Sequence, residues 1–324
     1  QNISDTQKVT LYYEDDTYID AFPKTENVAT FPNLNFDVVP TTTTNNVARC
    51  NLNATPYYDE TLKQIHVTGV DSAGNNVNNE VKCEIYDSLG LALGDEYFEK
   101  SNYTMNNISV MNDVDASDYN VHVESTVPEN LMFNVDMNNK NVYIDCVGYA
   151  IRLTNASVVN INNCKLLSCG GKVHSIFEID NEDAELYING GEYTHASTGN
   201  AIYPKQGKLI IRNADIYSPN GNIFRVGTTV AKEASDSNYN VHVEVIGGSA
   251  KSTNANIVHS ISRGTVLFSF VDVDLSSGQN IILCNNDKLD DNDAPEKGVY
   301  DNVRFYITGG SINCGNGREF STYG

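Results

Sequence analysis

The 324-residue sequence has few basic residues, no apolar run long enough to cross a membrane and no closely spaced cysteine pair. Its 21 Lys and Arg residues stand against 42 Asp and Glu residues, which gives a formal charge of −21. A surface this acidic repels nucleic acid and anionic lipid, so both are poor candidates for a partner. The composition predicts an extracellular or cell-surface protein with no nucleic-acid partner and no membrane insertion.

Cysteines at metal-binding spacing are also lacking. The seven cysteines are scattered, with no Cys-X-X-Cys pair, so a zinc site is not expected. Their odd number leaves at least one thiol free or bonded to another chain. Disulfide pairing and redox compartment therefore stay open. The six histidines show no metal-binding spacing either.

A degenerate repeat of strand-like segments is the strongest pattern present. SDYNVHVE (117–124) returns as SNYNVHVE (237–244), and both copies are expected to form the same strand of a repeated unit. In a second template, alternating apolar residues precede two mostly small residues, as in LYINGGEY (186–193), VEVIGGSA (243–250) and FYITGGSI (305–312). The alternation predicts strands with one buried face, and the small pair predicts a bend that favours Gly or Asn.

The units follow one another at spacings of roughly 19–26 residues, with longer intervals where a loop is inserted at a shared corner. Their first strands begin near Ile108, Met132, Ile151, Ile176, Ile202, Ile223, Ile257 and Ile281. Units this short cannot bury an apolar face alone, so they are expected to stack around a continuous core. Asn precedes four of these positions, and stacked Asn side chains would form an amide ladder, although turn chemistry also favours Asn. The four are Asn107, Asn222, Asn256 and Asn280.

Over about residues 105–320 these features resemble the right-handed parallel β-helix superfamily, often called pectin-lyase-like. The resemblance implies an all-β, right-handed parallel β-helix, and the eight unit starts predict about eight coils. A β-sandwich, which also contains many short strands, is the competing fold. Residues 1–62 are expected to form an N-terminal β-rich arm or small module, and 63–104 an irregular first coil and cap with a short helix within 89–100. Residues 105–324 would form the parallel β-helix.

Many proteins of this superfamily cleave polysaccharides with clustered carboxylates, or with Ca2+ and a basic residue. Two outward columns of side chains are predicted, where such a cluster would lie. The first is His122, Tyr143, Asn160, Tyr187, Ile210, Glu244, Ser269 and Tyr306, and the next includes Glu124, Asp145, Asn162, Asn189, Arg212 and Thr308. Neither holds three carboxylates, and no polygalacturonase signature lies on a predicted strand. No catalytic residue and no organic cofactor is therefore predicted.

The candidate metal site is an acidic loop, NDKLDDNDAPE (286–296). Its carboxylates are the hard oxygen ligands that suit Ca2+. They are Asp287, Asp290, Asp291 and Asp293. The loop lacks the EF-hand spacing, so an ordinary solvated acidic loop is the alternative.

The leading functional interpretation is a non-enzymatic extracellular structural protein, either a subunit of a self-assembling surface fibre or the shaft of an adhesin. Other copies of the chain are the expected partners, through the N-terminal arm and the ends of the stack, because a contact that does not close gives a filament. Two alternatives remain. One is a carbohydrate-active β-helix, as a polysaccharide lyase, a hydrolase or a tailspike-like protein, and the other is a glycan-binding adhesin without turnover.

Overall fold

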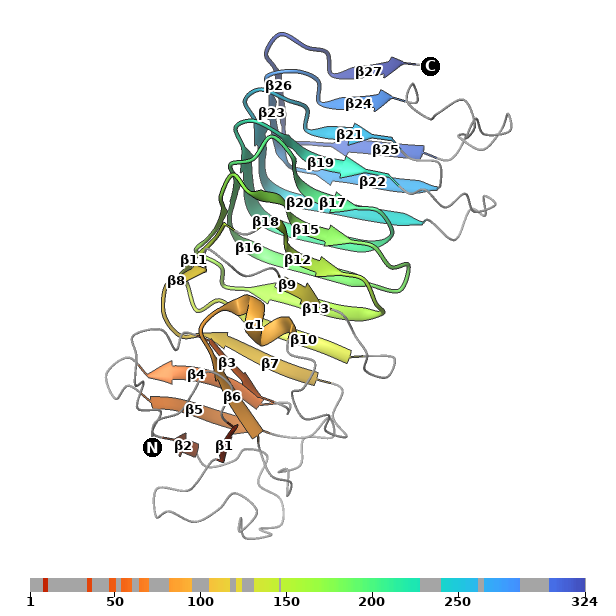
Figure 1. Cartoon of the computed structure of the whole chain (residues 1–324). Coiled ribbons are helices and arrows are strands. Elements are labelled where there is room, and N and C mark those ends of the chain that lie inside the picture. Colours follow the sequence, from red (N-terminus) through yellow and green to blue (C-terminus); the bar gives the residue numbers. More distant parts are fainter. Residues whose placement is uncertain are drawn as a thin grey trace.

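A computed structural model gives the architecture of the chain as a long stack of strands (Figure 1). It describes residues 8–10, 34–36, 47–50, 54–59, 64–69, 82–94, 105–116, 121–123, 131–145, 147–227, 240–261, 265–285 and 303–323. The candidate calcium ligands Asp287, Asp290, Asp291 and Asp293 lie outside these residues. The domain boundaries at residues 62 and 104 stay a prediction.

The first sheet has 16 strands. Its main path is β1 (Lys8–Thr10), β6 (Lys82–Tyr86), β3 (Val47–Cys50), β7 (Met105–Val110), β10 (Leu131–Asp136), β13 (Ser157–Asn162), β16 (Glu185–His195), β18 (Gly207–Ser218), β20 (Val241–Ser252), β22 (Val266–Val271) and β25 (Val303–Thr308). Beyond a bend the sheet continues through β8 (Val114–Ala116), β11 (Asn141–Ile144), β14 (Leu166–Cys169), β23 (Asp274–Ser277) and β26 (Ser311–Cys314). The long strands β16, β18 and β20 cross this bend and join the two parts.

The second sheet has eight strands. They are, in spatial order, β27 (Phe320–Tyr323), β24 (Ile282–Asn285), β21 (Val258–Ser260), β19 (Asn222–Val226), β17 (Asn200–Pro204), β15 (Val173–Ile179), β12 (Gly148–Leu153) and β9 (Val121–Val123). A small antiparallel sheet of β2 (Leu34–Phe36), β5 (Gln64–Gly69) and β4 (Ala54–Asp59) lies near the N-terminus. Among the described residues the single helix is α1 (Leu89–Gly94), which falls within the predicted helical segment.

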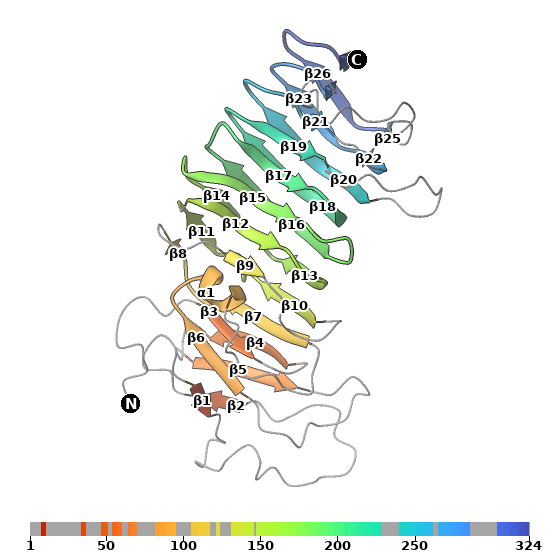
Figure 2. The same ribbon diagram turned by 45° about the vertical axis from the view of Figure 1, so that its right-hand side comes forward.

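From β9 onward the chain passes repeatedly between the two large sheets, and each strand pairs in parallel with the equivalent strand one turn further on (Figure 2). Sequence neighbours such as β15 and β16 therefore lie in different sheets. This all-β arrangement with parallel sheets is compatible with the predicted β-helix-like fold. It excludes the competing β-sandwich, whose sheets are antiparallel.

Inward side chains of successive strands lie in register and form apolar columns. In the first sheet one column is Leu186, Leu209, Val243 and Phe268. In the second sheet one column is Phe177, Ile202, Phe224 and Val258. All of these residues are fully buried, and the rings of Phe224 and Phe268 meet with centroids 5.1 Å apart. The predicted continuous core is therefore confirmed over these coils, with the inward faces of both sheets packed together.

The bend in the first sheet falls at the predicted pair of small residues. Gly190 and Gly191 have φ values of 78° and 98°, and Gly247 and Gly248 have values of 65° and 76°. This left-handed region is open to Gly at little cost. A Cβ atom added to Gly248 would also lie 2.1 Å from the carbonyl oxygen of Ala214, one turn away. Backbone conformation and close approach of the coils thus both require glycine there.

The predicted amide ladder is present at a corner of the second sheet. Asn222 donates from Nδ2 to Oδ1 of Asn200 at 2.9 Å, and Asn256 donates to Asn222 at 3.0 Å. Asn280 continues the ladder by donating to Asn256 at 2.9 Å, and its own Oδ1 accepts the backbone N–H of Arg318 at 3.1 Å. Each amide side chain thereby ties one coil to the next.

The repeat was predicted with one error of register. The octet copies are not equivalent, because Val121–Val123 forms β9 of the second sheet whereas residues 241–244 lie in β20 of the first. Similarly, Ile108 and Met132 lie in the first sheet, whereas Ile151 and the later unit starts lie in or beside strands of the second. The two sheets carry similar apolar alternation, and that similarity hid the half-turn offset. Asn107 accordingly belongs to a different column from Asn222.

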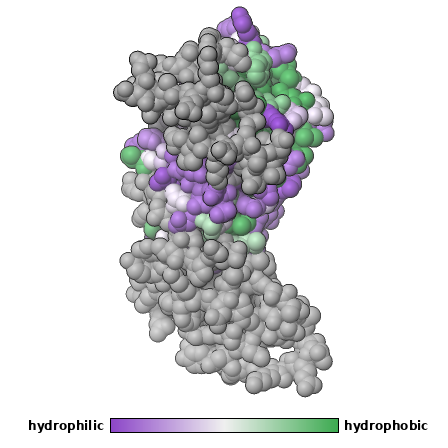
Figure 3. Space-filling model, turned by 90° about the vertical axis from the view of Figure 1, so that its right-hand side faces the viewer, coloured by the Kyte–Doolittle hydropathy of each residue, from purple (hydrophilic) through white to green (hydrophobic). Residues whose placement is uncertain are grey.

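The two ends of the stack differ. At the N-terminal end, α1 packs against β9, and its Leu89, Ala92 and Leu93 are buried in the core. At the C-terminal end lie β25, β26 and β27, whose apolar side chains include the exposed Ile312 and Phe320. Figure 3 shows hydrophilic residues over the middle of the stack and hydrophobic residues gathered towards this upper end.

Candidate functional site

The first predicted outward column is largely confirmed but needs two corrections. Register places Asn160, Tyr187, Ile210, Glu244, Ser269 and Tyr306 side by side on successive strands, as predicted. The positions assigned to Tyr143 and His122 belong instead to Asn134 and Asn107. Tyr143 lies in β11 opposite Ser168, and His122 lies in the second sheet opposite Arg152. The offset between the sheets explains the error at His122, whereas Tyr143 lies in the first sheet but beyond its bend.

This first column binds its own neighbours. Asn160 donates from Nδ2 to Oδ1 of Asn134 at 3.1 Å, which starts a second amide ladder. The phenol of Tyr187 donates to the carboxylate of Glu185, and Nζ of Lys208 lies 2.8 Å from the Tyr187 oxygen and 3.2 Å from Glu185. The hydrogen bond with Tyr187 and then those with Glu185 raise the pKa of Lys208 against the opposing effect of burial.

In the second predicted column, Asn162, Asn189 and Arg212 lie side by side in the first sheet. Asn189 donates to Asn162 at 3.0 Å. Glu124 lies outside the described residues, and Asp145 follows β11, so it is not in this column. Among the described side chains, no three His, Cys, Asp or Glu groups come together as a metal site.

A polar column on the second sheet was not predicted. It takes one residue from each of five successive strands, β12, β15, β17, β19 and β21, and is called the charged column below. Its members are Arg152, Glu178, Tyr203, Arg225 and His259. In each strand the residue follows a buried apolar side chain, such as Phe177 before Glu178. The alternation of the strand therefore turns the charged column away from the core.

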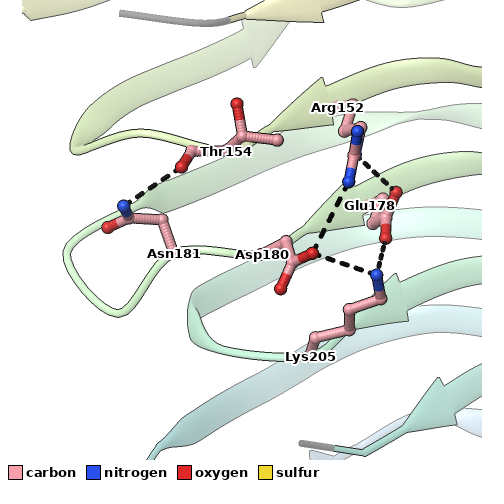
Figure 4. A network of polar contacts seen from close by, with 6 residues as sticks. All are labelled: Arg152, Thr154, Glu178, Asp180, Asn181 and Lys205. Carbon is pink, nitrogen blue, oxygen red and sulfur yellow. Dashed lines mark hydrogen bonds and ion pairs between the residues drawn. The ribbon is translucent and has the colours of Figure 1, made fainter. Parts of the chain in front are cut away.

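The centre of the charged column is a closed ring of ion pairs (Figure 4). Arg152 Nε lies 2.9 Å from Glu178 Oε2, and Lys205 Nζ contacts Oε1 of the same carboxylate. Asp180, just after β15, lies 3.0 Å from Lys205 Nζ and 3.6 Å from Arg152 Nη2. Two cations thus face two carboxylates, and Asn181 beside them donates to the carbonyl of Thr154 at 3.1 Å.

Burial differs sharply within this ring. The side chain of Glu178 is fully buried, whereas those of Arg152, Lys205 and Asp180 are partly exposed. Burial alone would lower the pKa of Lys205, but hydrogen bonds and charge from Glu178 and Asp180 outweigh it and raise that pKa. Taking a carboxylate out of water is costly unless its charge is matched by partners. Arg152 and Lys205 supply that match for Glu178.

Aromatic rings lie beside the cations of the charged column and of the ion-pair ring. The ring of Tyr203 lies 5.2 Å from Lys205 Nζ and 5.1 Å from Arg225 Cζ, within cation–π range. Tyr149 takes the same role beside Arg152 at 5.4 Å, and burial followed by the nearby Glu178 raises its pKa. Beyond Arg225, burial and then the charge of Arg225 lower the pKa of His259.

The ring of ion pairs places the carboxylates of Glu178 and Asp180 against the same lysine, Lys205. A glycosidase centre likewise needs two carboxyl groups close together. Glu178 is nevertheless sealed from solvent and held by two cations, so it has no access to a substrate. The partly exposed groups are Arg152, Lys205 and Asp180, with Tyr rings beside them. Such a surface suits contact with sugars or anions better than general acid–base work.

Sequence inspection could have found the charged column. The tripeptides Ile151-Arg152-Leu153, Phe177-Glu178-Ile179 and Phe224-Arg225-Val226 place a charged residue between two buried apolar ones. The described members of the two predicted outward columns lie in or beside strands of the first sheet, except His122. The pairing of Glu178 with both neighbours also depends on register between coils, which a single repeat does not reveal.

Comparisons with protein-family models, with curated proteins and with solved structures find no match for this chain. None of the described helices is long and apolar enough to cross a membrane.

Proposed function

We propose that this chain is a non-enzymatic extracellular structural protein, the shaft of an adhesin or a subunit of a surface fibre. The observation that carries the proposal is that polar side chains in successive coils bind one another along the stack. Asn222, Asn256 and Asn280 do so through their amides, and Glu178 does so through cations from the coils on both sides. Bonds of this kind strengthen a stack against bending and separation of its coils.

The proposal includes the finer fold, a right-handed parallel β-helix of about eight coils from the pectin-lyase-like superfamily. The eight strands of the second sheet, one for each turn, support the number of coils. Right-handed connections are strongly favoured where parallel strands of one sheet are joined by a crossover. That general preference supports the handedness.

Serine residues at a second corner support the structural role. Ser252 donates from Oγ to the carbonyl of Gly221 in the preceding coil at 2.8 Å, and Ser277 donates likewise to Ala255. Ser252 Oγ also accepts the backbone N–H of Ala255 at 3.1 Å. A buried hydroxyl used in this way fixes both its own turn and the spacing of two coils.

Electron microscopy of the purified chain, combined with a glycan-degradation screen, tests the proposal. Straight rods or filaments are expected, together with no release of new reducing ends or unsaturated sugars from a panel of neutral and acidic polysaccharides. Turnover of any polysaccharide at a rate that rises with protein concentration would overturn the structural proposal. The calcium loop is tested in the same preparation by adding Ca2+ and following the thermal midpoint.

Glycan binding without turnover is a second candidate. It is favoured by the partly exposed cations Arg152 and Lys205 beside the Tyr203 ring, because sugars stack on aromatic faces and hydrogen-bond to neighbouring charged groups. A glycan array tests it with Tyr203→Ala, and Tyr217→Ala on the other sheet serves as a matched control. Binding that falls only in Tyr203→Ala would support this candidate, and equal binding by both variants would contradict it.

A further inference from the structure

The C-terminal end of the stack exposes residues at positions that are buried in every described coil before it. Ile312 continues the column of Leu275, and Phe320 continues that of Ile282. Leu275 and Ile282 are 1% and 2% exposed, whereas Ile312 and Phe320 are 41% and 52% exposed. Ile307, one turn beyond the buried Phe270, is 37% exposed. Residues 303–323 are called the end coil below, and several of its core-column side chains are exposed at the end of the stack.

The strands of the end coil have described partners on one side. Within the described part of the chain, β25 pairs only with β22, β26 only with β23, and β27 only with β24. Three neighbouring strand edges therefore present rows of backbone N–H and C=O groups. Such edges readily pair with another chain unless they are covered. Apolar side chains and free edges thus coincide on one surface.

The opposite end of the stack offers a matching edge. The first sheet, which ends at β25 on one side, ends at β1 on the other. The strands β1, β6, β3 and β7 are joined by antiparallel pairs, so β1 runs opposite to β7 and hence to β25. Adding β25 of one copy beside β1 of the next would make an antiparallel pair and continue the sheet. Within each copy, α1 keeps the core behind that edge covered.

We propose that the end coil docks onto the β1 edge of the first sheet in a second copy of this chain, head to tail. This rests on the proposed structural function and names its partner. The contact joins two different surfaces, so it does not close on itself, and repeated addition gives a filament. Apolar burial of Ile312 and Phe320 supplies attraction, and the antiparallel match between β25 and β1 sets the orientation.

Sedimentation velocity of the full chain over a wide concentration range tests the docking. Wild-type protein is expected to associate as concentration rises, and Ile312→Asp is expected to lower the association constant at least about tenfold. Val147→Asp is the matched control, because Val147 is an apolar residue on another part of the stack with 68% exposure. Phe320→Asp gives a second variant, and circular dichroism with urea unfolding checks that each variant is folded.

Mixing labelled Ile312→Asp protein with wild-type protein distinguishes the head-to-tail contact from a two-fold contact between end coils. An Ile312→Asp chain keeps its N-terminal region, so labelled variant is expected to join wild-type chains and stop their growth. If labelled variant never joins wild-type chains, the contact is two-fold and the head-to-tail inference is wrong. Wild-type protein that stays monomeric at every concentration also overturns it, while a monomeric shaft remains consistent with the proposed function. Glycan turnover would overturn the proposed function and leave the docking result unaffected.

Discussion

The two ends of the stack contain the same kind of apolar core but differ in what covers it. At the N-terminal end, Ala92 and Leu93 of α1 lie in the core cluster, and antiparallel strands continue the first sheet. At the C-terminal end, Ile312 and Phe320 occupy core columns but are exposed. The comparison teaches that register alone does not bury a side chain. A residue in a core column is buried only when another layer lies beyond it.

A helix is an effective cover for such a stack. Its backbone hydrogen bonds are formed within the helix, so it covers apolar side chains without presenting a new strand edge. Ser88 supports α1 locally, since its Oγ accepts the backbone N–H of Leu91 at 3.2 Å. A final strand has no such property and leaves one row of backbone groups for a partner. The core at the N-terminal end is therefore covered in a way that the core at the C-terminal end is not.

The largest expected effect on the free energy of unfolding comes from a substitution in α1, the helix that covers the core. Leu93→Asp places a charge in the core beneath α1 and is expected to lower the free energy of unfolding by about 4–5 kcal/mol. Ile312→Asp, at an exposed core position, is expected to change it by less than about 0.5 kcal/mol in the monomer. Urea unfolding at low protein concentration measures both. Equal destabilisation by the two variants would contradict the claim that only the N-terminal end has a covered core.

The next effect locates where the buried core stops. Phe268 and Phe305 are neighbours in one column, with ring centroids 5.8 Å apart, but only Phe268 is fully buried. Phe268→Ala is expected to cost about 3–5 kcal/mol, because it leaves a cavity between packed rings. Phe305→Ala is expected to cost about 1.5 kcal/mol, because less apolar surface is lost. Urea unfolding of the two variants checks the order, and a larger loss at Phe305 would contradict it.

A smaller effect on the free energy of unfolding is expected from the buried carboxylate in the middle of the stack. Glu178→Gln removes the buried partner of Arg152 and Lys205 and is expected to cost about 3 kcal/mol. Glu185→Gln is the control, since Glu185 pairs with Lys208 at 3.2 Å but both side chains are more than a third exposed. That change is expected to cost less than about 1 kcal/mol. The same unfolding measurement applies, and a Glu178→Gln protein as stable as wild type would refute the sealed ion-pair ring.

The smallest effect is a pH dependence inside the closed region. His195 is fully buried, and its Nε2 bonds to the carbonyl of Val173 at 2.9 Å, so this nitrogen carries the proton of the neutral ring. Burial lowers the pKa of His195 below its ordinary value, although the Val173 bond opposes the shift. The unfolded state then takes up a proton near pH 6.5 before the folded state does, and stability falls as pH drops below that value.

His195→Gln, which keeps an amide donor but does not titrate, is expected to flatten this loss between pH 6.5 and 5.5. Burial lowers the pKa values of His242 and His259 as well, so part of the dependence should persist. Thermal unfolding across this pH range measures the difference. An unchanged slope in the variant would show that His195 titrates alike in both states.

Much of the fold was accessible from local patterns. Alternating apolar residues predicted strands, Gly190 and Gly191 fell at the bend, and Asn222, Asn256 and Asn280 formed the ladder. The alternation and the glycine pair involve neighbouring residues of one unit, and the ladder asparagines recur at the same place in successive units. Local spacing is therefore enough to predict them.

The remaining features depend on contacts between coils. Alternation cannot tell which sheet a strand joins, so the octet copies at β9 and β20 looked equivalent when they were not. The ring around Glu178 needs partners from two other coils, Arg152 and Lys205, brought together only by the register. Exposure of Ile312 depends on what lies beyond the end coil, which its own sequence does not encode.

Hydrogen exchange at increasing protein concentration tests the difference between the two ends most directly. If the end coil docks on a second copy, amides of β25, β26 and β27 should exchange more slowly as concentration rises, because their free edges become paired. The amides of α1, which covers the core and is not part of the proposed contact, should exchange at an unchanged rate. Exchange at β25, β26 and β27 that is independent of concentration would contradict the account, as would protection that appears only at α1.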